Sequence, residues 1–139
     1  MSNATDYLES SIGDALFMGG ALTVTQWTVH LYSAAPAENG QGGTEVTAGA
    51  NGYQPVRCDP GAGNWGKAAN QDASGNTLYR NLVPIQFPAV VTSWGGVNYV
   101  GLKNQAGQLC LVAPLTVQKN FAVGDAPVFL TGELEFAIG

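Results

Sequence analysis

The apolar residues near the N-terminus recur with the period of a helix. Leu8, Ile12 and Leu16 follow at intervals of four, which places them on one face of an α-helix, with Phe17 beside that face. The double glycine at 19–20 is typical of a helix C-terminus. A helix of about 11 residues is only marginally stable alone in water, so we expect it to pack against the body or a neighbouring subunit.

The start of this helix carries a capping signal. Thr5 or Asp6 can serve as the N-cap, and Glu9 lies three residues beyond Asp6, in the arrangement of a capping box. The sequence therefore predicts that residues 1–20 form an amphipathic helical arm.

From Gln26 onward the apolar period changes to two, which indicates β-strands. In the segment WTVHLYS, Val29 and Leu31 share one face, and His30 is expected on the outward face. About seven or eight such strands, separated by turn signals, are typical of a β-sandwich or jelly roll. We therefore predict an all-β fold, with a single β-sandwich domain over residues 21–139 after the short N-terminal amphipathic helix.

Two long segments rich in Gly, Ala and Asn interrupt the strand pattern, at 34–52 and 59–76. Loops of this length are uncommon in compact domains and are often functional or mobile. A tight hairpin is expected at 105–107, and a turn at Gly124.

Charged residues make up only 11% of the chain, against a usual share of about 25%. The net charge is −5, with five basic residues, which argues against binding to nucleic acid or to an anionic membrane surface. No apolar run is long enough to span a membrane. A surface of small neutral polar groups suits packing against other proteins, because few charges must be desolvated.

Cys58 and Cys110 lie in predicted strands without the spacing of a metal or redox motif. We interpret both as buried free thiols of a protein made in a reducing cytoplasm, although a disulfide between them stays open.

The candidates for catalysis and metal binding are weak. His30 is the single histidine, and no nucleophile motif accompanies it. Glu133 and Glu135 stand about 7 Å apart along a strand, as glycosidase carboxylates do, but alternating acids usually mark a solvent face. Residues 70–75 imitate half of a calcium loop, yet the position of the essential glutamate holds Asn81. We predict no catalytic, cofactor or metal residues.

Two tryptophans precede glycines, and the sequence leaves their roles open. Trp94 is expected to fill the core beside a Gly-Gly bend. Trp65 lies in the second long loop, where it can either pack or stack against a sugar ring.

Four segments in collinear order resemble a family of small phage virion proteins that are usually labelled phage tail-fibre proteins. They are ATDYLESSIGDALF, VHLYSAAPAENGQGGTEV, FPAVVTSWGGVNYVGL and GDAPVFLTGELEFAIG. A fibre shaft needs repeats or coiled coils, and this chain has neither. A compact sandwich with an arm is also similar to jelly-roll capsid decoration (cement) proteins. The segment GKAANQDASGNTLYRNLVP departs from the family pattern, so the role of the 59–84 loop stays open.

The resemblance implies a non-enzymatic virion structural protein, assembled in the host cytoplasm. We expect a decoration protein that contacts the major capsid protein, other virion proteins and copies of itself, as a homodimer or homotrimer. Leu8, Ile12, Leu16 and Phe17 are the expected subunit interface. The alternative is a tail-fibre or tail-tip adhesin that binds host surface glycan, with Trp65 as the loop contact.

Overall fold

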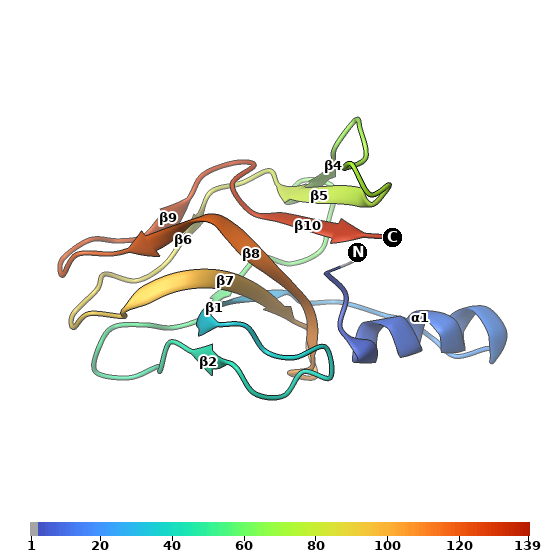
Figure 1. The fold of residues 1–139 in the computed structure, drawn as a ribbon, viewed down its shortest axis with the longest axis horizontal. Coiled ribbons are helices and arrows are strands. Elements are labelled where there is room, and N and C mark those ends of the chain that lie inside the picture. The colour runs from blue at the N-terminus through green and yellow to red at the C-terminus, as the bar shows by residue number, and fades with distance from the viewer. Residues whose placement is uncertain (1–2) are drawn as a thin grey trace.

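The computed structural model describes residues 3–139, which form one helix and ten strands (Figure 1). The prediction of an all-β fold with a short N-terminal helix is confirmed. In chain order the elements are α1 (Asp6–Phe17), β1 (Thr28–Ala34), β2 (Thr44–Glu45), β3 (Val56–Arg57), β4 (Trp65–Lys67), β5 (Thr77–Asn81), β6 (Ile85–Gln86), β7 (Gly96–Lys103), β8 (Leu109–Asn120), β9 (Val128–Phe129) and β10 (Glu135–Ile138).

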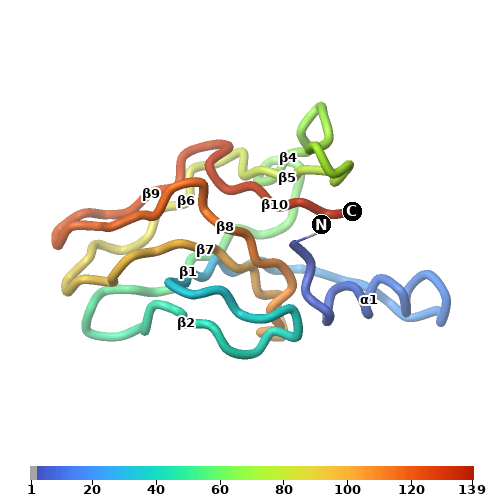
Figure 2. Tube along the Cα trace, in the orientation of Figure 1, coloured from blue at the N-terminus to red at the C-terminus, as the bar shows by residue number. Residues whose placement is uncertain are grey.

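The strands form three antiparallel sheets in two layers. The largest has the order β2-β1-β7-β8, with β3 paired to β1. A three-stranded sheet, β10-β5-β4, and the β6-β9 pair lie over it in Figure 1. The continuous trace in Figure 2 shows the long strands β7 and β8 crossing the middle of the molecule, with the helix projecting beyond one end.

The core lies between these layers and contains an aromatic cluster. Trp94 is only 6% exposed and packs edge-on against Tyr53, with ring centroids 5.4 Å apart. Phe87 and Phe129 continue the cluster. The prediction that Trp94 fills the core is therefore confirmed.

Several strands differ from the sequence prediction. β2 and β4 lie inside the two segments predicted as loops, and β5 was not predicted. β8 is one continuous strand of 12 residues that includes Pro114. A proline is tolerated there because β8 is the edge strand of its sheet, so no ladder hydrogen bond is lost.

The prediction that His30 faces outward into solvent is wrong. His30 is 9% exposed, and its neighbour Tyr32 is 4% exposed, so β1 is covered on both faces. The cause is β2, which pairs with β1 and brings Glu45 opposite Tyr32.

The helical arm is attached to the body at both of its ends. Before the helix, Ala4 forms a bridge with Leu111 of β8, and the Asn3 amide donates to the Ala137 carbonyl at 2.7 Å. After the helix, the Gln105 side chain binds the returning chain: it accepts from the Thr25 amide and donates to the Thr23 carbonyl. Among residues 3–139, no helix is long and apolar enough to span a membrane.

Candidate interaction surfaces

The two halves of α1 have different surroundings. Leu8 is buried in the core of its own chain, and Ile12 packs against that core. Further along, Leu16 is 72% exposed, Phe17 86% and Met18 78%. We call these three residues the apolar tip. Single exposed apolar residues are ordinary, but three in a row at the end of a projecting helix are typical of a contact surface (Figure 1).

The apolar tip is held in place by the end of the helix. The Asp14 carbonyl accepts hydrogen bonds from the Met18 amide at 2.9 Å and from the Gly20 amide at 3.0 Å. This pair of hydrogen bonds requires one residue with a left-handed backbone conformation. Gly19 provides it, with φ of +70°. The predicted glycine stop is thus confirmed, and it presents the three side chains on a fixed turn.

The predicted N-cap uses its side chain differently. Thr5 is the N-cap residue, but its hydroxyl makes no hydrogen bond to the helix. It donates instead to the Leu109 carbonyl of β8 at 2.7 Å. Thr5 therefore fixes the base of the arm to the sheet.

The second surface is an apolar groove of about 500 Å³ between the two layers. The large sheet contributes Leu111, and the three-stranded sheet contributes Trp65 and Phe136. Lys67, Tyr79 and the indole N–H groups of its two tryptophans are the polar groups among its side chains. Other lining residues include Trp27, Pro60, Ala62 and Ile138.

Trp65, the predicted loop contact, is a half-buried wall of this groove. Its ring meets Phe136 edge-on, with centroids 6.1 Å apart. Its indole N–H donates to the Cys58 carbonyl at 3.0 Å. Packing therefore fixes the ring, and its remaining surface faces the groove.

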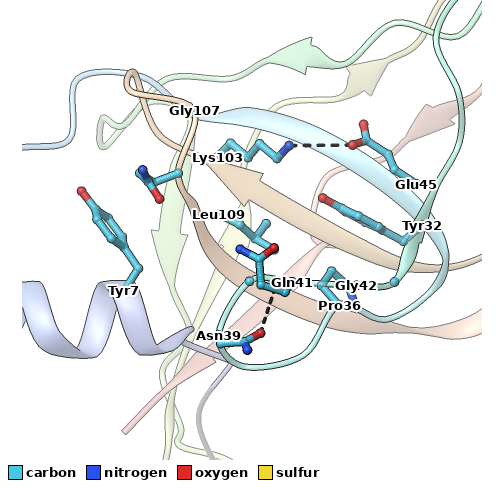
Figure 3. Close-up of a pocket in the computed structure, with 13 residues that line it drawn as sticks. Tyr7, Tyr32, Pro36, Asn39, Gln41, Gly42, Glu45, Lys103, Gly107 and Leu109 are labelled. Atoms are coloured by element: carbon cyan, nitrogen blue, oxygen red, sulfur yellow. Dashed lines mark hydrogen bonds and ion pairs between the residues drawn. The ribbon is translucent and has the colours of Figure 1, made fainter.

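A polar hollow of about 420 Å³ lies between the 36–43 loop and the end of the β7–β8 hairpin (Figure 3). Glu45 and Lys103 face each other across it, with Nζ 3.8 Å from Oε1. The other Glu45 oxygen is 2.6 Å from Nδ1 of His30 and accepts from the Tyr53 hydroxyl at 2.9 Å.

This network holds Glu45 in its ionised form. Burial acts to raise the pKa of Glu45, but the hydrogen bonds from His30 and Tyr53, together with the charges of His30 and Lys103, outweigh it and lower the pKa. Burial raises the pKa of Tyr53 and of Tyr32, and the nearby Glu45 carboxylate raises both further. The lone histidine is therefore bound to a carboxylate that links β1, β2 and the core.

The remaining candidate residues have structural partners. Asp72 accepts from the Ser74 and Asn76 amides, each at 2.9 Å, which makes the 70–75 segment an Asx turn. Glu135 pairs with Arg80 across the strands at 2.5 Å. Over residues 3–139, no three His, Cys, Asp or Glu side chains converge as metal ligands would.

Cys58 and Cys110 are both buried and free, as interpreted from the sequence. Burial raises the pKa of the Cys110 thiol to about 11, and it also raises that of Cys58. Both thiols therefore act as small core side chains.

The comparison with protein families covers nearly the whole chain. The family model described as "Podophage GP4 fiber I protein gp80" matches residues 3–137. The chain belongs to this family. No curated protein matches the chain. Membership makes it a bacteriophage structural protein and a component of the virion, where it assembles with other virion proteins.

The sequence did not predict all the residues of the apolar tip and of the apolar groove in this fibre-family protein. Met18 belongs to the apolar tip, and its signal was the apolar run LFM directly before Gly19-Gly20. Tyr79 was missed because β5 was not predicted, although it lines the groove. No sequence signal brings Leu111 and Trp65 together, since the contact joins two different sheets.

Proposed function

We propose that this chain is a non-enzymatic fibre subunit of the phage virion, attached to its neighbours through the apolar tip. The single observation that carries the proposal is the exposure of Leu16, Phe17 and Met18, at 72%, 86% and 78%, on a helix whose base is bound to the body. Burying an apolar side chain of this size stabilises a contact by roughly 1.5–3 kcal/mol. Repeated subunits multiply such modest contacts within one particle.

The expected interface divides at the middle of the helix. Leu8 and Ile12 hold the arm against its own chain, while Leu16 and Phe17 contact the neighbour. The first half of the arm is therefore fixed to its own chain, and the second half binds the neighbouring subunit.

The test is incorporation of variants into virions. Phage lacking the wild-type copy of the gene are complemented with Leu16→Ser/Phe17→Ser, and the amount of this protein per purified particle is measured by quantitative mass spectrometry. We expect incorporation to fall by at least about tenfold, since losing roughly 1.4 kcal/mol already costs a factor of ten. The matched control is Val117→Ser, because Val117 is 68% exposed in β8. Normal incorporation of the double variant, or equal loss in the control, contradicts the proposal.

A second position in the virion is favoured by the shape of the body. The helix has 12 residues, and over residues 3–139 the chain has neither a shaft nor a coiled coil. Such a body also suits a capsid decoration protein bound to the major capsid protein. A subunit that binds only the assembled shell shifts the equilibrium toward the intact particle. A copy number per virion close to that of the major capsid protein favours this position, whereas a few to some tens of copies favour the fibre.

The adhesin alternative places a host glycan on Trp65. Hydrogen bonds orient a sugar, and the side chains of the groove offer few polar partners, among them Lys67, Tyr79 and the indole N–H of Trp27. An adhesin requires measurable glycan binding that Trp65→Ala abolishes. A glycan array without signal for the wild-type protein removes this alternative.

A further inference from the structure

We propose that the apolar groove receives the apolar tip of a second copy of this chain, and that two copies exchange tips reciprocally. This inference rests on the proposed function, because it names one neighbour that the tip contacts. It starts from two complementary features on one molecule: a projecting group of three apolar side chains and an apolar hollow of about 500 Å³.

The chemistry of the groove fits a hydrocarbon occupant. Its walls include Trp65, Phe136 and Leu111 from both layers of the fold. A polar ligand needs several fixed hydrogen-bond partners to replace water, and few are offered here. Phenylalanine, leucine and methionine need none, so the tip can enter without leaving polar atoms unpaired.

A chain cannot place its own tip in its own groove. Ala4 pairs with Leu111, so the arm begins beside the groove wall. The helix then leads away from the body (Figure 1). At a rise of about 1.5 Å per residue, Phe17 lies roughly 16 Å from Asp6 along the helix axis. Two copies related by a twofold axis, with their helices antiparallel, bring each tip to the base of the other arm.

Reciprocal exchange doubles the contact area of the pair. Burying the three side chains of one tip removes on the order of 350 Å² from water. The groove that receives them exposes a smaller area, so a reciprocal pair falls below the roughly 800 Å² per partner of a standard interface and belongs with the weaker contacts. A one-way contact has half that area and does not close on itself.

The charges are also complementary. Helix α1 contains Asp6, Glu9 and Asp14 and no basic residue. Lys67 is exposed on the groove lining, and Asp14 is the carboxylate nearest the tip in the helix. A docked tip therefore brings a carboxylate toward an ammonium group instead of toward a like charge.

Disulfide trapping between two variants, each with one introduced cysteine, tests which surfaces meet. Met18→Cys protein, which keeps Phe17, is mixed in air with Ala62→Cys protein, because Ala62 is exposed and lines the groove. The native thiols of Cys58 and Cys110 are buried. Docking raises the local thiol concentration from about 10 micromolar to about 1 millimolar, so we expect an 18–62 disulfide about 100-fold faster than a random one. The matched control is Ala122→Cys, because Ala122 is exposed in the segment between β8 and β9. That segment lies at the end of the body opposite α1 (Figure 1).

Sedimentation measures the same contact without added thiols. We expect a wild-type dimer whose dissociation constant rises about 100-fold in Phe17→Ser, as for a central aromatic contact residue. The double variant Asp14→Lys/Lys67→Glu should dimerise more tightly than Lys67→Glu alone.

The outcomes separate this inference from the proposed function. If the 18–62 disulfide forms no faster than the 18–122 control, or the wild-type protein sediments as a monomer at 100-micromolar concentration, the inference is overturned. If virion incorporation still depends on Leu16 and Phe17 in that case, the tip binds a different virion protein and the proposed function stands. If both fail, the tip is not an interface.

Discussion

At the scale of single residues, buried polar side chains connect segments that the sequence separates. Asn81 is completely buried and joins the end of β5 to the turn before β10. Its amide nitrogen donates to the Val83 and Leu130 carbonyls, and its oxygen accepts from the Leu134 amide. An apolar side chain of similar size leaves the Val83 carbonyl and the Leu134 amide without these partners, whereas the Leu130 carbonyl still accepts from the Glu133 amide.

Asn81→Leu should therefore lower the free energy of unfolding by about 3 kcal/mol or more. Urea unfolding followed by tryptophan fluorescence measures this change. Asn70→Leu is the matched control, because Asn70 is exposed in a loop and its replacement should change stability by less than about 0.5 kcal/mol. Equal effects at the two positions would contradict the bridging role of Asn81.

Glu45 makes stability depend on pH. Its pKa is lower in the folded chain than its ordinary value of 4.5. Its contribution is therefore complete above that value and is lost as the pH falls through the lower folded pKa. Glu45→Gln should cost about 1–2 kcal/mol at pH 7, and the difference from wild type should shrink below about pH 4.5. Urea unfolding at both pH values measures the difference; a constant difference would show that the charge is not responsible.

At the scale of elements, α1 combines one half that stabilises the fold with one half that does not. Leu8→Ala should lower the free energy of unfolding by about 2–5 kcal/mol, because it leaves a cavity against the sheet. Phe17→Ala should change it by less than about 0.5 kcal/mol in the monomer, because that ring is exposed. Calorimetry on dilute protein compares the two, and a large loss in Phe17→Ala would mean that the tip packs on its own body.

Sequence periodicity predicts the helix and the longer strands of this chain but not the shortest strands. The helix, its glycine stop and the β7–β8 hairpin follow from local spacing, and all three are confirmed. β2 and β4 contain two and three residues, which is too short for any alternation to be visible. Their pairing is decided by the strands beside them, not by their own residues.

At the scale of the whole molecule, the interaction surfaces depend on how distant segments meet. The sequence predicted the apolar face of the helix, but not that Leu8 would lie under the body and Leu16 outside it. The arm is bonded to the first residues of β8, at Leu109 and Leu111, so only the first half of the helix lies against the sheet. The groove was not predicted, because Leu111 and Trp65 belong to different sheets.

The double attachment of the arm has a mechanical consequence. Residues 3–5 are bonded to β8 and β10, and the returning chain is bonded through Gln105 to the β7–β8 turn. A pull on the arm is divided between two separate sets of bonds, so neither set carries the whole load. A particle component of this design resists shear and detachment better than one that hangs from a single flexible tail.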